Sequence, residues 1–135
     1  MDVDESVLSG EDPSQYVTRL ARTKANACDD ACALILAADT TVALKGAILG
    51  KPIDRADARR MLTALSGQTH DVFTAVCIRR GEIVREVLVR SSVSFAELSQ
   101  DTISAYLLTD EPWDKAGGYG IQGMAGSFVR AIHGS

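Results

Sequence analysis

The sequence has few of the residues that build disulfide frameworks or transition-metal sites. It contains three cysteines and two histidines in 135 residues, with no Cys-x-x-Cys spacing. An odd number of thiols without that spacing favours ordinary reduced cysteines over a zinc site. Cys28 and Cys32 could approach each other around a helix end, so a single disulfide is the less favoured alternative.

Long apolar runs and an excess of positive charge are also missing. No run is long enough to cross a bilayer, and the acidic start lacks the basic region and apolar segment of a signal peptide. The formal charge of −4 argues against a general nucleic-acid binder, which needs a basic face. We therefore expect a cytoplasmic protein with neither a membrane nor a nucleic-acid partner. A few local lysines would still allow it to bind a small anion.

Hydrophobic residues make up 46% of the chain and charged residues 24%, which is typical of one soluble domain. Apolar spacing and capping residues predict helices from Pro13 to about Cys28, from Asp54 to Leu65 and from Ser99 to about Leu108. Runs rich in Val, Ile and Ala, separated by turn residues, predict strands over residues 33–38, 41–49, 71–79, 83–95 and 127–132.

The stretch from Leu34 to Asp54 is the first candidate for chemistry. An apolar run predicts a buried strand that ends at Asp39, and groups at the carboxyl ends of strands often meet a ligand in α/β sheets. The alternative is structural, because Asp and Thr after a strand often support a turn and Lys45-Gly46 is an ordinary hairpin signal. Position alone favours neither interpretation of Asp39.

Three further charged residues, Glu5, Lys24 and Lys51, are candidates for contact with a ligand. Glu5 lies in an acidic start that is either a solvated terminus or a source of hard oxygen ligands for a divalent ion. Lys24 falls in the apolar stripe of the first helix, where its ammonium either extends to solvent or meets an anion in a cleft. Lys51 lies between Gly50 and Pro52, which favour a tight turn followed by extended backbone.

A second dense stretch, residues 111–123, combines four glycines and a proline with acidic, basic, aromatic and amide side chains. Such a loop can approach a ligand closely, whereas a surface linker seldom carries Trp, Tyr and Ile together. His70 stands alone before a strand, which favours a hydrogen-bonded structural histidine over an acid or base.

Six segments, taken together, form a recognisable series of motifs. They are Val3-Asp4-Glu5, Arg19-Leu20-Ala21 with Lys24-Ala25, Ala38-Asp39-Thr40-Thr41-Val42, Gly50-Lys51-Pro52-Ile53-Asp54, Leu65-Ser66-Gly67-Gln68-Thr69-His70 and the run from Glu111 to Gly123. In these segments the sequence resembles the Maf family of nucleoside-triphosphate pyrophosphatases, and the resemblance extends in family order from the first residues to the last.

The resemblance implies an α/β fold in which an elongated mixed sheet is flanked by helices and two lobes enclose a cleft, similar to inosine-triphosphate pyrophosphatases. It implies hydrolysis of a nucleoside triphosphate to a monophosphate and pyrophosphate with Mg2+ or Mn2+, and it is compatible with a homodimer. Asp39 would be the proton acceptor and a metal ligand, and Glu5 a second metal ligand.

By the same resemblance, Lys24 and Lys51 would hold the triphosphate, and Thr40 and Gln122 would be specificity positions. The Asp-Thr-Thr-Val and Gly-Ile-Gln-Gly sequences are similar to the branch that prefers dTTP and UTP. Cleavage of a phosphoanhydride requires neutralisation of the phosphate charge and an oriented water molecule, which a metal, two lysines and one carboxylate can provide.

The chain differs from the family pattern at both ends. Family members normally start with a strand and a Ser-x-x-Arg-Arg loop and continue into a C-terminal helix, so the expectation for residues 1–135 is a single domain truncated at both ends. The alternative functions are a catalytically impaired nucleotide-binding or interaction module in cell-division control, and a 7-methyl-GTP pyrophosphatase.

Overall fold

The computed structural model describes residues 5–28, 33–120 and 123–134. Its long five-stranded sheet has the order β2-β1-β3-β4-β5. The strands are β1 (Ile35–Leu44), β2 (Ala47–Leu49), β3 (Thr69–Arg80), β4 (Ile83–Phe95) and β5 (Val129–Gly134). The α-helices are α1 (Pro13–Asn26), α2 (Arg55–Leu65) and α3 (Gln100–Leu107), and the short 3-10 helices are η1 (Glu111–Asp114), η2 (Ala116–Gly118) and η3 (Met124–Phe128).

The helices begin where the sequence provides capping side chains. Asp12 caps α1 in a reciprocal pair with Gln15, and Asp54 and Ser99 cap α2 and α3 by accepting backbone N–H groups. The predicted inner face of α2 is buried throughout, and so are the inward residues predicted for α3. The α/β class and the helix positions are therefore confirmed.

All four described strand pairings are antiparallel, so the sheet differs from the mixed sheet that was expected. The tight turns at Lys45-Gly46 and Gly81-Glu82 make hairpins of β1–β2 and β3–β4, and hairpins impose antiparallel pairing. The connection through α2 returns the chain to β1 from the side opposite β2, again antiparallel.

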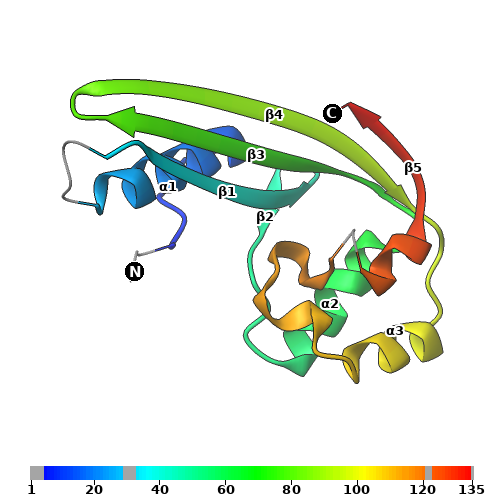
Figure 1. Cartoon of the computed structure of the whole chain (residues 1–135). Helices are drawn as coiled ribbons and strands as arrows, with labels where there is room; N and C mark the ends of the chain where they lie inside the picture. Colours follow the sequence, from blue (N-terminus) through cyan, green and yellow to red (C-terminus); the bar gives the residue numbers. More distant parts are fainter. Residues whose placement is uncertain (1–4, 29–32, 121–122, 135) are drawn as a thin grey trace.

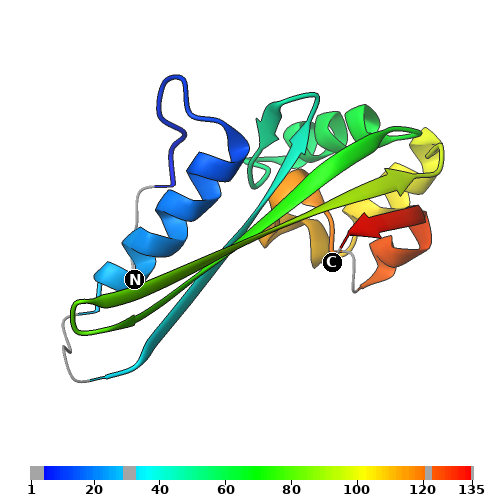
Figure 2. The ribbon, with the colours of Figure 1, turned by 90° about the horizontal axis from the view of Figure 1, so that it is seen from above.

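The helices gather at opposite ends of the sheet and form two lobes (Figure 1). Helix α1 packs near the β3–β4 hairpin, on the face that carries Ala75 and Cys77. Helices α2 and α3 surround the other end, where Val42 and Val93 point to the opposite face of the sheet. Figure 2 shows the strong twist of the long strands between the two lobes. Within the described residues, no helix is long and apolar enough to cross a membrane.

Candidate active site

A cleft of about 1420 Å³ lies between the two lobes. Its walls come from the segment before α1, from α1, β1, β3 and β4, from the connection after β2, and from the glycine-rich stretch after α3. Two segments far apart in the sequence are linked here, because the Gly117 N–H donates to the Gly50 carbonyl at 3.0 Å. That bond holds the residue before Lys51 against the glycine-rich stretch.

Asp39 lies in the middle of β1 and not at the end of a strand. The strand runs from Ile35 to Leu44 and pairs with β3 along nine residues, including Asp39 with Ala75. The prediction of a strand end at Asp39 is wrong because the polar residues Thr40 and Thr41 continue the ladder instead of turning. The first half of the strand alternates between half-buried and exposed positions, and Leu36 is 69% exposed, so this segment is not the fully buried strand expected.

Four charged residues from separate segments meet at one side of the cleft, where Glu5, Asp39 and Lys51 line it and Lys24 contacts the two carboxylates from behind. The ammonium Nζ of Lys24 lies 3.2 Å from Asp39 Oδ1 and 3.7 Å from Glu5 Oε1. The ammonium Nζ of Lys51 lies 3.6 Å from Glu5 Oε2. We call these four residues the charged cluster. Lys24 therefore turns toward the acidic residues of the cleft, the alternative that the helical stripe left open.

The charged cluster is partly desolvated. The side chain of Asp39 is 15% exposed, whereas that of Lys51 is 55% exposed. Opposite charges at such distances attract more strongly where water is partly excluded. Asp39 is thus held close to Lys24, while Lys51 reaches in from the solvent side.

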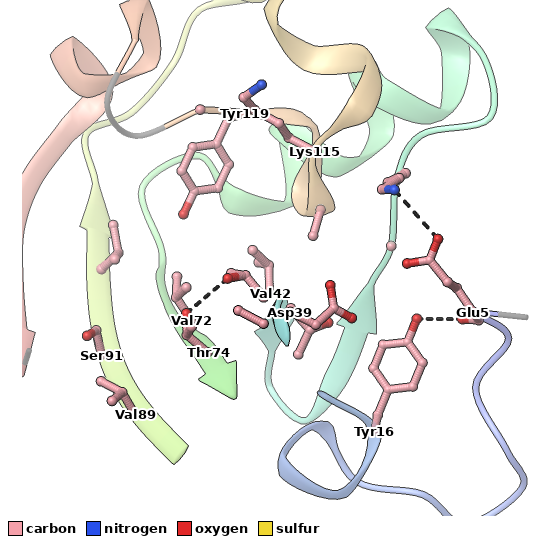
Figure 3. Close-up of a pocket in the computed structure, with 18 of the residues that line it drawn as sticks. Glu5, Tyr16, Asp39, Val42, Val72, Thr74, Val89, Ser91, Lys115 and Tyr119 are labelled. Carbon is pink, nitrogen blue, oxygen red and sulfur yellow. Dashed lines mark hydrogen bonds and ion pairs between the residues drawn. The ribbon is translucent and has the colours of Figure 1, made fainter. Parts of the chain in front are cut away.

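Tyr16 supports the charged cluster, a role that the sequence did not reveal. Its hydroxyl donates to the backbone carbonyl of Glu5 (Figure 3). Burial, and then the negative charges of Asp39 and Glu5, raise the pKa of this phenol, so it remains a donor. The apolar spacing of α1 correctly placed Tyr16 on the buried face but gave no sign of its polar contact.

The glycine-rich stretch forms the opposite wall with Glu111, Lys115, Tyr119 and neighbouring backbone. Figure 3 shows Lys115 and Tyr119 across the cleft from Glu5 and Asp39. A Cβ on Gly117, whose φ is 74°, would come within 3.2 Å of Val42, so glycine permits this close approach. The described part of this stretch, expected to be a loop, forms the short helices η1 and η2 and lines the cleft. Gln122, the second predicted specificity position, lies outside the described residues.

The carboxylate of Glu111 fixes the far end of this wall. It accepts hydrogen bonds from the backbone N–H groups of Met124 and Ala125 at 2.9 and 3.2 Å and from the Tyr106 hydroxyl at 2.9 Å. Burial raises the pKa of Glu111, but these donors together outweigh it and hold the pKa below its ordinary value. Glu111 is therefore a structural anchor as well as a lining residue.

His70 is a buried structural residue, as its sequence context favoured. It is 2% exposed, and its Nε2 lies 2.5 Å from the Tyr119 hydroxyl. Burial lowers the pKa of His70 to about 4, so the ring is neutral near pH 7. The bond orients Tyr119, and with it one wall of the cleft.

Thr40 points to the face of the sheet opposite to that of its neighbour Asp39, as successive strand residues do. Its hydroxyl lies 3.0 Å from the Thr74 hydroxyl on β3. The cleft around this pair is otherwise largely apolar, with Val42, Val72 and Val89. One end of the cleft therefore carries the charged cluster, and the other carries valines and hydroxyl groups.

Two carboxylates in the charged cluster could share a divalent ion. Among the described residues, no three His, Cys, Asp or Glu side chains form a group that could hold a metal by themselves. Mg2+ commonly binds through one or two carboxylates together with substrate phosphates and water. The donor set of Glu5 and Asp39 therefore fits an ion that is completed by a phosphate-bearing ligand.

The sequence of this chain is similar to the sequences of known proteins. The family model described as Maf-like protein matches residues 1–135. The dTTP/UTP pyrophosphatase of Anaeromyxobacter dehalogenans (strain 2CP-1) is 51% identical over 138 residues, which cover 99% of this chain and 70% of the relative.

The dTTP/UTP pyrophosphatase of Shewanella denitrificans is also 51% identical, over 142 residues that cover 99% of this chain and 70% of the relative. The dTTP/UTP pyrophosphatase of Pseudoalteromonas atlantica is 49% identical over 140 residues, which cover 99% of this chain and 73% of the relative. These matches extend over nearly the whole chain, and the chain therefore belongs to the Maf-like protein family.

Proposed function

We propose that this protein hydrolyses dTTP and UTP to the nucleoside monophosphate and pyrophosphate. The observation that carries the proposal is the convergence of Glu5, Lys24, Asp39 and Lys51 at one end of a cleft whose other end is largely apolar. Charged groups suit a triphosphate, and an apolar end with a few hydroxyl groups suits a base. The substrate names of the relatives support the choice of dTTP and UTP.

In the proposed reaction, water attacks the α-phosphorus and the bond from this phosphorus to the oxygen bridging to the β-phosphorus breaks. Asp39 accepts a proton from the attacking water, since it is the least exposed carboxylate of the charged cluster. Lys24 and Lys51 neutralise phosphate charge, which increases on the leaving pyrophosphate. Asp39, Lys24 and Lys51 come from three different segments of the chain, which are β1, α1 and the connection after β2.

We also propose that Glu5 and Asp39 bind a divalent cation, Mg2+ or Mn2+, together with the triphosphate. A bound cation would polarise phosphoryl oxygens and offset their charge. Lys24 lies between the two carboxylates and limits their mutual repulsion when no cation is bound. A nucleoside triphosphate substrate also supports a cytoplasmic location, where such nucleotides are made and used.

The proposal is tested by incubating the purified 135-residue chain with each common nucleoside triphosphate and with 7-methyl-GTP, with Mg2+ or with EDTA. We expect equal amounts of monophosphate and pyrophosphate from dTTP and UTP, and no reaction with EDTA. Release of orthophosphate, or a preference for 7-methyl-GTP, would contradict the proposal. Thermal stabilisation by nucleotides without any turnover would indicate a binding module instead.

The variant Lys51→Gln links such an activity to the charged cluster. This change keeps a polar side chain, one bond shorter, but removes its positive charge, so we expect weaker triphosphate binding and a higher KM. Lys45→Gln is the matched control, because Lys45 lies at the β1–β2 turn and does not line the cleft.

A further inference from the structure

The hydroxyl groups of Thr40 and Thr74 form a hydrogen-bonded pair in the largely apolar end of the cleft, which Ser91 also lines. The residues are direct partners in the β1–β3 register, and their Oγ1 atoms lie 3.0 Å apart. Both residues line the cleft, and a dashed line marks their contact in Figure 3. Thr74 was not among the residues to which the sequence assigned a role.

The surroundings of this pair are suited to a planar ligand. Val72 and Val89, the residues next to Thr74 along and across the sheet on the same face, are apolar and line the cleft. Tyr119 contributes a ring to the opposite wall and is held by His70. Apolar walls with a few polar groups are typical of sites that orient a ligand through those groups.

A hydrogen bond between two hydroxyls restricts what the pair can offer to a ligand. Each threonine hydroxyl has one donor hydrogen and can accept two hydrogen bonds. One hydrogen is used within the pair, so the pair presents a single donor together with its remaining lone pairs. Thymine and uracil offer O4 as an acceptor and N3–H as a donor. Cytosine offers the reverse pattern, a donor amino group beside the acceptor N3.

We propose that Thr74 is a positioning residue for base selection, whose hydroxyl donates its hydrogen to the Thr40 oxygen, so that the Thr40 hydrogen is directed to O4 of thymine or uracil. This inference rests on the proposed function and deepens it by naming how the base is chosen. Asp39 lies on the opposite face of β1, in the charged cluster that is proposed to bind the triphosphate. Without the Thr74 hydroxyl, the Thr40 hydroxyl rotates freely and can donate or accept, so discrimination against cytosine weakens.

The test compares Thr74→Val, which keeps the branched shape without the hydroxyl, with Thr74→Ser, which keeps the hydroxyl. For Thr74→Val we expect the ratio of kcat/KM for dTTP to that for dCTP to fall about 3- to 10-fold, the value of one neutral hydrogen bond. The change should appear mainly in KM, because the phosphate end is unaltered. Thr74→Ser should restore most of the ratio.

A matched control exists on the same strand. Thr69 pairs with Ser94 through hydroxyl oxygens 2.7 Å apart, and Thr69 does not line the cleft. Thr69→Val removes the same kind of cross-strand bond and should leave the dTTP-to-dCTP ratio unchanged. An equal shift in both variants, or no shift in Thr74→Val, would overturn the inference.

A binding measurement separates this inference from the proposed function. dTMP and dCMP contain no phosphoanhydride, so their dissociation constants, measured by calorimetry, do not depend on hydrolysis. We expect the wild type to prefer dTMP and Thr74→Val to lose much of that preference. Absence of turnover with this preference intact would reject the hydrolytic function alone. A wild type that binds dTMP and dCMP equally would reject the role of Thr74.

Discussion

The two lobes are packed in different ways, although they share the same long strands. The lobe around α2 and α3 has a cluster of large buried side chains in which Phe95, Tyr106, Tyr119 and Phe128 meet edge to face. The lobe around α1 has a smaller cluster of buried Val, Ala and Cys side chains. Since apolar burial provides most of the stabilising free energy, the first lobe should dominate stability.

The difference also relates to function. Small side chains let α1 lie close to the sheet, which brings Tyr16 and Lys24 to the rim of the cleft beside Asp39. The aromatic lobe instead holds Tyr119 and the glycine-rich stretch as a fixed wall. The charged cluster is thus attached to the more weakly packed lobe, and the wall to the more strongly packed one.

Phe95→Ala is expected to have the largest effect on stability. Phe95 is 1% exposed and contacts the rings of His70 and Tyr119, with centroids 5.0 and 4.9 Å away. Truncation should cost about 4 kcal/mol in the free energy of unfolding, measured by urea denaturation. Phe73→Ala, on the half-buried side facing α1, should cost clearly less. An equal or larger cost at Phe73 would contradict the comparison.

His70 should make stability depend on pH in the acidic range. Burial lowers the pKa of His70 to about 4 in the folded state, below the ordinary value of 6.5, so the unfolded chain binds the extra proton first. The contribution of the neutral His70 ring to the free energy of unfolding is fully present above about pH 6.5. It decreases by about 3 kcal/mol as the pH drops toward 4. The measurement is urea denaturation at several pH values.

The matched control for this pH dependence is His133→Gln, because His133 lies exposed in β5. This variant should keep the loss of stability seen in the wild type between pH 6.5 and 4. His70→Gln should lose that part of the pH dependence. A His70→Gln profile that follows the wild type would show that another group causes the acid sensitivity.

Glu111→Gln should weaken the wall of the cleft. The amide cannot accept the same set of hydrogen bonds from Met124, Ala125 and Tyr106, and we expect a loss of about 2 kcal/mol, as is typical of bonds to a charged group. Fluorescence of the single tryptophan, Trp113, can follow unfolding of this lobe. Glu97→Gln, at an exposed position, should change stability by no more than about 0.5 kcal/mol.

Val17→Ala should have the smallest effect of these changes. Val17 is fully buried in the small cluster, and loss of two methyl groups should cost about 1.5 kcal/mol. Hydrogen exchange should show the backbone amides around α1 opening at a lower free energy than those of α2, with a larger change at α1 in the variant. Uniform exchange in both lobes would contradict the difference in packing.

Much of the fold could be predicted because local signals and tertiary packing agree. The caps at Asp12, Asp54 and Ser99 and the apolar faces behind them mark the three helices. The turn residues at Lys45-Gly46 and Arg80-Gly81-Glu82 mark two hairpins. The antiparallel return of β3 to β1 could not be predicted, because it depends on how α2 packs and not on a local signal.

Less of the site could be predicted from local patterns. The resemblance to family motifs identified Glu5, Lys24, Asp39 and Lys51, which the structure brings together. The continuation of β1 past Asp39 was missed, because the pairing of Thr40 and Thr41 with β3 stabilises it and a single strand does not reveal its partner. The same holds for Thr74, whose contact with Thr40 depends on register alone.

Catalysis by the charged cluster is tested most directly by the rate of pyrophosphate release from dTTP in the variant Asp39→Asn. Loss of the proton acceptor should lower kcat at least about 100-fold while the protein stays folded. The control is Asp71→Asn, because Asp71 is a carboxylate on the same sheet, paired with Arg90 at 3.0 Å and outside the cleft. The account predicts near wild-type turnover for Asp71→Asn, and wild-type turnover by a folded Asp39→Asn variant would contradict it.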